Sequence, residues 1–557
     1  MVTAMNDVLQ KNWPSGVSKT LTYRLGEIPL HEYVKHNAEH MPKNIAYHFY
    51  GNDLTWQALD EAIDRLAQFY KTQRIVKGDR IGLYLQNCPQ YLIGHYAIQR
   101  IGAIVVPLNP MYKEAELSYI INESKLKSII VGQELYPYIQ NITNETPTLK
   151  LIITTNYIDY LPDNPTLTFP KGYQLPKQHH EHTYDLLQIL NETAPLQDYL
   201  KIDIWEDVAL LAFTSGTSGR PKGAMLTHGN ALFKTAANVY TNGIKPADKM
   251  LTVAPLCHIA GMLMGVNLPV YSGCTTVLLT RFDPHTTIDA IESHQVTTWY
   301  SIAPMNAAIL QVPGIEKRNL TSLRKNLATS FGIAVTQSLA DKWKAITDGG
   351  LLFEASYGLS ETHTGDTFMP QENIKYGSCG IPTFNTEMKI INSLTGESVP
   401  NGEEGEVILR NPGVFKGYLN HPEATSETLR DGWLYTGDIG KIDEEGYLFY
   451  LGRLKEMIKC SGYSVFPDDV EALLGRHPAI QQSVVVGVPD KKRGESVKAF
   501  IILKPDYKNK VQPSEIIEWS KENMAAYKYP REVEFLDALP TTGSGKVLRR
   551  LLKEDRD

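Results

Sequence analysis

Residues 214–223 form the segment whose composition points most directly to chemistry. The segment reads Thr-Ser-Gly-Thr-Ser-Gly-Arg-Pro-Lys-Gly and directly follows an apolar run at 208–213. Glycines let backbone N–H groups approach an anion closely, while the hydroxyl groups and Lys222 supply further donors. A flexible Ser/Gly turn is the structural alternative. The Pro-Lys-Gly ending and the apolar runs on both sides favour a loop that binds phosphate.

The spacing around this lysine differs from that of a Walker P-loop, which needs a glycine, four residues and then Gly-Lys-Ser/Thr. Lys222 is preceded by Pro221 and followed by Gly223. A second glycine-rich segment, Gly-Ser-Gly-Lys at 543–546, fails the same test because Pro540 stands at the place of the first glycine. The sequence therefore argues against a P-loop ATPase.

Several further segments follow a recognisable order along the chain. They are Pro-Leu-Cys-His-Ile-Ala-Gly-Met at 255–262, Tyr-Gly-Leu-Ser-Glu-Thr at 357–362, Tyr-Thr-Gly-Asp at 435–438 and Pro-Thr-Thr-Gly-Ser-Gly-Lys at 540–546. With the first loop they resemble the adenylate-forming superfamily, which includes acyl-CoA synthetases, adenylation domains of peptide synthetases and beetle-type luciferases. The resemblance covers about residues 30–552 and is closest to bacterial medium- or long-chain fatty-acid–CoA ligases.

The resemblance implies a set of ATP-binding residues. The phosphate loop would contribute Thr214, Ser215, Gly216, Thr217, Ser218, Gly219 and Lys222. The adenine and α-phosphate contacts would come from Gly332, Ile333, Ala334, Tyr357, Gly358 and Ser360. In this set Tyr357 would stack on adenine and Ser360 would bind the α-phosphate. Asp438 would accept hydrogen bonds from the ribose hydroxyl groups, since a carboxylate has the capacity for both, and Arg453 would add a second ribose contact.

Four residues are implied in the chemistry itself: Lys546, Glu361, Lys459 and His258. Lys546 would bridge the substrate carboxylate and the α-phosphate while negative charge rearranges. Lys459 would act when the CoA thiol attacks, and His258 would gate or orient the carboxylate. Glu361 would bind Mg²⁺, a hard cation that prefers oxygen ligands.

Each of these residues also has an ordinary structural interpretation. Glu361 could satisfy free N–H groups at the start of a helix, His258 could be a satisfied core histidine, and Lys546 could lie in a solvated tail. Two segments depart from the family pattern. Ser-Phe-Gly-Ile-Ala at 330–334 is bulkier than the usual Ser-Gly-Gly-Ala-Pro, and Ser461 stands where many relatives carry a second lysine.

The apolar stretch at 251–280 bears on which acid is activated. Amino-acid-activating relatives usually place an Asp in this region, and the stretch contains none, so an amino-acid substrate is not expected. Gly261, Met262, Met264 and Gly265 are candidates for the wall of an apolar channel around an alkyl chain. Plain core packing is the alternative for the two methionines.

The elements that must position these residues alternate between strands and helices. Apolar runs at 45–49, 81–85 and 103–106 predict strands. Thr55 is predicted to cap a helix whose apolar face repeats near the helical period, and Pro89 is predicted to lie in the first turn of another. This βαβ rhythm predicts a mostly parallel sheet covered by helices.

The length of 557 residues indicates more than one domain. Strands predicted at 483–488 and 497–503 belong to a second, smaller unit. With the resemblance, this implies an α/β fold with a large N-terminal multi-sheet domain at 1–451 that binds ATP and the acyl group. The resemblance also implies that a smaller, mobile C-terminal α+β domain at 452–557 would pivot at Lys455.

The composition bounds the remaining possibilities. The chain has 55 Lys and Arg against 62 Asp and Glu, a net charge of −7, which gives no electrostatic reason to expect nucleic-acid binding. Five cysteines without CxxC spacing fit a reducing, cytoplasmic compartment.

The stretch at 251–280 is too interrupted to span a membrane, although a transient contact with a membrane surface is compatible with the sequence. The cluster of His179, His180 and His182 predicts a solvated loop rather than a metal site.

The resemblance implies an enzyme, an ATP-dependent fatty-acid–CoA ligase. It would form acyl-AMP and pyrophosphate, and then an acyl-CoA thioester and AMP. The expected partners are ATP, CoA and a medium- to long-chain fatty acid, with Mg²⁺ accompanying ATP. The alternatives are a ligase that charges a carrier-protein pantetheine, a ligase for an aryl acid, and a catalytically silent module that binds an acyl-adenylate. A luciferase-like oxygenase is the most distant alternative.

Overall fold

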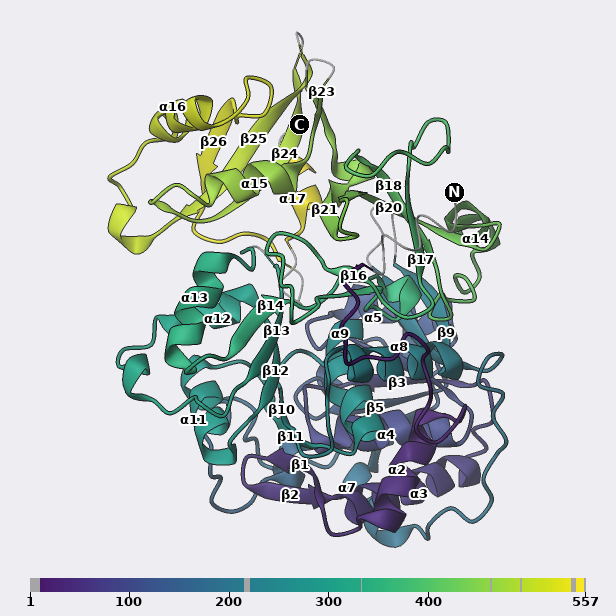
Figure 1. The fold of residues 1–557 in the computed structure, drawn as a ribbon. Coiled ribbons are helices and arrows are strands. Elements are labelled where there is room, and N and C mark those ends of the chain that lie inside the picture. Colours follow the sequence, from purple (N-terminus) through teal and green to yellow (C-terminus); the bar gives the residue numbers. More distant parts are fainter. Residues whose placement is uncertain are drawn as a thin grey trace.

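The computed structural model describes residues 11–214, 221–331, 333–460, 463–490, 493–541 and 547–554. Two seven-stranded sheets, each flanked by helices, form the larger part of the molecule (Figure 1). A smaller antiparallel sheet adjoins them, and a further sheet belongs to the C-terminal part. The predicted α/β fold, with a large multi-sheet N-terminal domain and a smaller C-terminal domain, is confirmed.

The first large sheet has the strand order β7-β6-β5-β3-β4-β8-β9. All neighbours run parallel except β8 and β9, which form an antiparallel pair at one edge. Its strands are β3 (Arg80–Tyr84), β4 (Ile104–Pro107), β5 (Ser128–Gly132), β6 (Leu151–Thr155), β7 (Tyr184–Asp185), β8 (Val208–Thr214) and β9 (Lys222–Thr227). Every residue of β5 is buried, as expected for a parallel strand covered on both faces.

The second large sheet has the order β14-β13-β12-β10-β11-β1-β2. It is parallel apart from the β1–β2 hairpin, which comes from the beginning of the chain. Its strands are β1 (Ile45–Phe49), β2 (Asn52–Thr55), β10 (Lys249–Thr252), β11 (Thr275–Leu278), β12 (Thr298–Ile302), β13 (Lys325–Thr329) and β14 (Leu351–Glu354). The early hairpin thus completes a sheet whose other strands lie about 200 to 300 residues later.

The helices begin where the sequence supplies a start. The Thr55 hydroxyl accepts the N–H of Ala58 at the start of α3 (Trp56–Thr72), and Pro89 begins α4 (Pro89–Arg100), as predicted. Every residue of α4 is buried, so this helix lies in the core. The other helices of this part include α2 (Leu30–His40), α5 (Glu114–Ser124), α6 (Tyr136–Asn141), α7 (Leu186–Glu192), α8 (His228–Thr241), α9 (Ile259–Met262), α10 (Leu268–Ser272), α11 (Pro284–His294), α12 (Ala303–Leu310) and α13 (Gln337–Ile346).

Besides the two-stranded pair of β15 (Thr367–Phe368) and β16 (Ile381–Pro382), two smaller five-stranded sheets complete the fold. The first contains β17 (Glu387–Ile391), β18 (Gly405–Arg410), β19 (Leu429–Arg430), β20 (Trp433–Ile442) and β21 (Leu448–Arg453), followed by the short helix η6 (Leu454–Glu456). The second contains β22 (Ile458–Cys460), β23 (Tyr463–Val465), β24 (Ile480–Asp490), β25 (Gly494–Leu503) and β26 (Glu532–Phe535), with α15 (Pro467–Leu474), α16 (Pro513–Asn523) and α17 (Arg549–Glu554). This second sheet lies at the top of Figure 1 and has its own apolar core. The predicted domain boundary at residue 452 lies at the end of β21 and stays a prediction.

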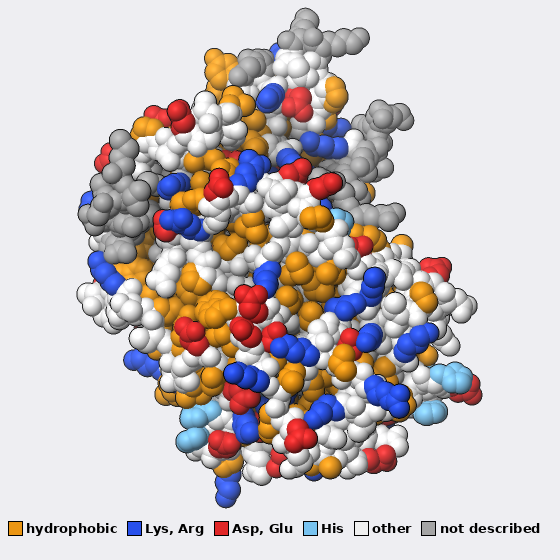
Figure 2. Space-filling model, turned by 90° about the vertical axis from the view of Figure 1, so that its right-hand side faces the viewer, with side chains coloured by type: hydrophobic (Ala, Val, Ile, Leu, Met, Phe, Trp, Pro, Cys, Tyr) orange, Lys and Arg blue, Asp and Glu red, His pale blue; other side chains and the backbone are white. Residues whose placement is uncertain are grey.

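The surface agrees with the balanced composition. On the face shown in Figure 2, Lys and Arg side chains lie interspersed with Asp and Glu. None of the helices in the described ranges is long and apolar enough to cross a membrane. Among the residues that the structure describes, no cluster of three or more His, Cys, Asp or Glu could hold a metal ion, and His180 packs against the ring of Tyr136.

Candidate active site

A cleft of about 2770 Å³ brings most of the described candidate residues together. It is lined by both large sheets, by the β20–β21 hairpin and by the C-terminal helices α15 and α17. The candidate residues that line it are Thr214, Lys222, His258, Ile333, Ala334, Tyr357, Gly358, Ser360, Glu361, Asp438 and Arg453. The strands explain this convergence: β8, β12, β13 and β14 all end at the cleft, and open parallel sheets bind ligands beyond their carboxyl ends.

Tyr357, Asp438 and Arg453 form a connected polar group in the cleft. The Tyr357 hydroxyl donates to Oδ2 of Asp438 over 2.6 Å, and Nε of Arg453 lies 2.8 Å from Oδ1. The register of β20 and β21 pairs Asp438 with Arg453, which explains why both side chains reach the same place. Burial and the neighbouring carboxylate raise the pKa of Tyr357 well above its usual value, so the phenol keeps its proton.

Glu361 lies near the end of the segment at 357–362, called the adenylate segment below, in the short helix η5 (Ser360–Thr362). Its Oε1 accepts the Tyr418 hydroxyl at 2.7 Å, and its carbonyl accepts the N–H of Phe415 at 2.8 Å. The Lys222 ammonium lies 5.7 Å from the centre of the Tyr418 ring. Tyr418 therefore links the described end of the phosphate loop to Glu361. A single carboxylate suits Mg²⁺ bound mainly through substrate phosphates.

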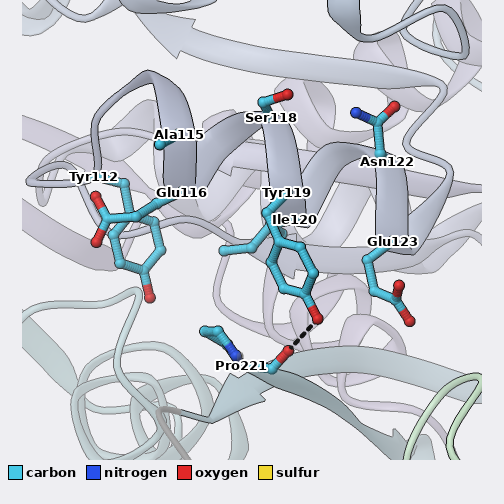
Figure 3. Close-up of a pocket in the computed structure, with 9 residues that line it drawn as sticks. All are labelled: Tyr112, Ala115, Glu116, Ser118, Tyr119, Ile120, Asn122, Glu123 and Pro221. Carbon is cyan, nitrogen blue, oxygen red and sulfur yellow. Dashed lines mark hydrogen bonds between the residues drawn. The ribbon is translucent and has the colours of Figure 1, made fainter. Parts of the chain in front are cut away.

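The segment predicted to bind phosphate, at 214–223, includes the end of β8 and the start of β9, whose register pairs Thr214 with Lys222. On the outer side, the Tyr119 hydroxyl of α5 donates to the Pro221 carbonyl over 2.9 Å (Figure 3). A second cavity of about 720 Å³ lies against α5 at this point. The predicted residues Ser215, Gly216, Thr217, Ser218, Gly219, Gly332 and Lys546 lie outside the described residues.

Glu354 is a buried carboxyl group that the sequence analysis did not identify. It ends β14, lines the cleft and accepts two hydrogen bonds from Ser330, one from the N–H at 3.1 Å and one from the hydroxyl. The Ser330 hydroxyl also accepts the N–H of Val335 at 3.0 Å. Burial raises the pKa of Glu354 to about 7, although the bonds from Ser330 oppose this rise.

The segment expected to form the acyl pocket is only partly as predicted. His258 lies in the cleft wall and caps α9 by accepting the N–H of Ala260. Gly261 does not face an open channel, because a Cβ there would lie 2.1 Å from the Pro255 carbonyl oxygen. A Cβ on Gly265 would lie 2.4 Å from the Thr252 side chain. Both glycines allow close packing instead.

The methionines of this segment differ from each other. Met264 lines the cleft, whereas Met262 is buried and is not among the lining residues that the structure describes. Met262 ends α9 and Met264 lies in the π-helix that follows (Leu263–Asn267), and residues two apart along a helix point to different sides, so the composition alone could not assign them. The Ile259 and Leu263 side chains also line the cleft, and the sequence analysis did not single them out.

The two candidate residues of the C-terminal part, Lys455 and Lys459, differ in whether they line the cleft. Lys455, in η6, lines the cleft. Lys459 is exposed on β22, its N–H donates to Glu495 at 2.7 Å, and it is absent from the described part of the cleft wall. Arg549 begins α17 and forms ion pairs with Glu456, Asp468 and Glu471.

A family model described as AMP-binding enzyme matches residues 34–419, and one described as AMP-binding enzyme C-terminal domain matches residues 469–546. The chain belongs to the AMP-binding enzyme family.

The relatives of this AMP-binding enzyme are ligases that act on different acids. The long-chain-fatty-acid–CoA ligase of Bacillus subtilis (strain 168) is 37% identical over 532 residues, which cover 93% of each chain. The feruloyl-CoA synthase of Amycolatopsis sp is 33% identical, over 90% of this chain and 93% of the relative. The crystal structure of the anthranilate CoA ligase AuaEII in complex with anthranoyl-AMP gives a TM-score of 0.83 at 26% identity, over 94% of this chain and 96% of that one. This AMP-binding enzyme is an acid–thiol ligase that forms acyl-CoA through an acyl-adenylate.

Proposed function

We propose that the acid is a medium- to long-chain fatty acid. In the first step a carboxylate oxygen attacks the α-phosphorus of ATP, the bond to the β-phosphate oxygen breaks, and acyl-AMP and pyrophosphate form. In the second step the CoA thiol loses its proton, its sulfur attacks the acyl carbon, and AMP leaves. The products are an acyl-CoA thioester and AMP.

The observation that supports a fatty acid is the apolar side of the cleft. Its walls come from three places in the fold, namely α9 with the following π-helix (Leu263–Asn267), the ends of β12 and β13, and the helices α12 and α13. The apolar residues on this side are Ile259, Leu263, Met264, Tyr300, Ala307, Leu310, Leu327, Val335 and Leu339. An alkyl chain there gains free energy by leaving water, and Met264 offers an adaptable contact.

The polar side of the cleft supports the roles proposed for ATP. Ser360 would bind the α-phosphate, Asp438 and Arg453 would hold the ribose, and Tyr357 would stack on adenine. Glu361 would hold the Mg²⁺ that accompanies ATP, and CoA is the second substrate. Five free cysteines fit our proposal of a cytoplasmic location.

An aryl acid is the second candidate, because the printed names of relatives include feruloyl-CoA synthase and anthranilate CoA ligase. The test is a panel of alkanoic acids of increasing length, with ferulate and anthranilate, assayed with Mg-ATP and with or without CoA. We expect AMP and pyrophosphate from the longer alkanoic acids, and thioester only when CoA is added. Faster turnover of an aryl acid would overturn the proposal.

The acceptor and the catalytic competence are tested in the same panel. A carrier protein bearing pantetheine replaces CoA in one series; preferential charging of the carrier would assign it as the acceptor. If none of the acids in the panel yields acyl-AMP while AMP still binds to the protein, the result favours a catalytically silent module that binds an acyl-adenylate.

A further inference from the structure

A fully buried ion pair lies directly beneath the adenylate segment. Lys234, on α8, and Asp366, five residues after Glu361, have side chains with no exposed surface, and their charged atoms are 2.5 Å apart. The Lys234 ammonium also donates to the Gly365 carbonyl at 3.2 Å. Burial lowers the pKa of Lys234, and Asp366 opposes this effect.

Asp366 fastens both ends of the adenylate segment. Its backbone N–H donates to the Tyr357 carbonyl at 2.7 Å, and its Oδ2 accepts the Thr362 hydroxyl. Its Oδ1 accepts from Asn411 at 2.8 Å as well as from Lys234. Ser360 and Glu361, which line the cleft, lie between the two fastened points. Asp366 therefore holds these two residues from both sides, through its backbone N–H at Tyr357 and through its carboxylate at Thr362.

The backbone after Thr362 adopts a conformation that needs support from surrounding contacts. His363, Thr364 and Gly365 have φ values of 58°, 58° and 65°, so three consecutive residues adopt the left-handed conformation. This conformation is disfavoured for residues with a Cβ and persists only where surrounding contacts over-determine it. The contacts here include the backbone and carboxylate bonds of Asp366 and the bond from Lys234 to the Gly365 carbonyl, and Lys234 is itself paired with Asp366.

The same pair also supports the segment on the other side of Glu361. The Lys234 side chain passes so close to Gly413 that a Cβ there would lie 2.2 Å from its Cε. Asn411 bonds to Asp366, and Phe415 donates its N–H to the Glu361 carbonyl. A buried ion pair is a poor source of stability, because removing both charges from water is costly. Its contribution here is to hold the neighbouring segments in position.

We propose that Lys234 and Asp366 are positioning residues for adenylation, which hold Ser360 and Glu361 at the α-phosphate and the metal site. This inference rests on the ATP-binding roles proposed above. The pair touches neither the reacting atoms nor the open cleft within the described residues, so its effect acts through the adenylate segment.

The test uses the double variant Lys234→Met/Asp366→Asn in the full-length enzyme. Removing both charges avoids leaving one buried charge alone, which is the main risk of each single variant. We expect a thermal midpoint close to that of the wild type, with acyl-AMP formation slowed about 10²-fold, as for a small misplacement of catalytic groups. Thioester formation from supplied acyl-AMP and CoA should change less than about threefold, because the α-phosphate is no longer attacked.

The matched control is Arg100→Met/Asp60→Asn/Asp64→Asn, which removes the whole buried charge cluster between α3 and α4, none of whose members lines the described cleft wall. It should leave the ratio of the two half-reaction rates unchanged. The proposal is overturned if the Lys234 and Asp366 double variant forms acyl-AMP at the wild-type rate. It is also overturned if both half-reactions fall together in proportion to a loss of thermal stability.

AMP binding, measured by calorimetry, gives a readout that does not depend on the acid. We expect the double variant to bind AMP about tenfold more weakly, the loss of roughly one hydrogen bond to a charged group. Unchanged AMP binding together with an unchanged rate of adenylation would contradict the proposal that the pair positions the adenylate segment. Failure of fatty acids in the wild type would overturn only the proposed substrate, and the variants would then be assayed with the acid that the panel identifies.

Discussion

Asp438 illustrates how a single side chain can be held in its binding position before a nucleotide enters the cleft. Its side chain is only 2% exposed, and a buried carboxylate is costly unless it is paired. Arg453 supplies the charge and Tyr357 donates a short hydrogen bond. A ribose that enters would therefore meet an acceptor already held in place, so less ordering is needed on binding.

The two lysines of the C-terminal domain give the first prediction. Lys546→Ala should slow acyl-AMP formation by about 10²–10³, the usual loss for one well-placed charge donor, while synthetic acyl-AMP and CoA still give thioester. Lys459→Ala should show the opposite and weaker bias. Single-turnover kinetics of each half-reaction measures both effects. Acyl-AMP formation at the wild-type rate in Lys546→Ala would leave the lysine in a merely solvated tail.

Glu354 gives a prediction on pH. Its pKa in the folded protein, about 7, lies above the ordinary value of 4.5, so the folded state holds this proton more tightly than the unfolded chain does. The resulting stability is complete below pH 4.5 and is lost as the pH rises through 7, on the order of 3 kcal/mol in total.

Glu354→Gln removes this dependence. The unfolding free energy of the variant relative to the wild type should therefore increase between pH 5 and pH 8. Denaturant titrations at several pH values measure the difference, in which the other titrating groups cancel. A constant difference would show that the carboxyl group does not titrate in this range.

The sequence could identify Tyr357, Glu361 and Asp438 because each belongs to a short, ordered segment. It could not identify Tyr418 or Glu354, since their partners Glu361 and Ser330 lie 57 and 24 residues away. Only the fold brings such pairs together.

At the level of elements, most of what could be predicted came from turn and cap residues. Thr55 and Pro89 begin helices as predicted, and alternating strands and helices produced the parallel sheets. The pattern could not show that the chain builds two large sheets, nor that β1 and β2 join the later one. Both facts depend on pairing between strands far apart in the sequence.

Helix α12 gives the prediction on chain length. Ala307 lines the apolar side of the cleft, so Ala307→Phe should fill part of the space needed by a long chain. We expect kcat/KM to fall about tenfold or more for the longest acids accepted by the wild type, a loss of at least 1.4 kcal/mol of binding, and to change little for short acids.

The control for this variant is Ala308→Phe, on the same helix but absent from the described cleft wall. It should not alter the order of preference among the acids. A uniform loss across all chain lengths in Ala307→Phe would indicate misfolding or a different acyl channel.

Over the whole molecule, buried histidines predict sensitivity to acid. His95 and His363 are buried, and burial lowers their pKa values to about 3 and about 4. Burial also lowers the pKa of His228 well below its usual value. These rings are neutral in the folded protein, whereas the unfolded chain binds their protons below about pH 6.5. Stability from this source is therefore complete above pH 6.5 and is lost as the pH falls towards 4.

We expect the thermal midpoint to fall steeply between pH 6.5 and pH 4.5. His363→Asn is the informative variant, since His363 has a φ of 58° and Asn tolerates the left-handed region. Its midpoint should fall less over the same range than that of the wild type. Parallel curves for the two proteins would assign the acid sensitivity to other groups.

The pairing of β8 with β9 has a consequence for how the chain can be divided. One break between Thr214 and Lys222 would produce an early piece that lacks β9 and a late piece that lacks β1 and β2. Neither piece could complete both large sheets alone, yet each carries the strands that the other needs. The two pieces should therefore assemble when produced together, and fused to two proteins that bind each other they would form a ligase whose activity reports that encounter.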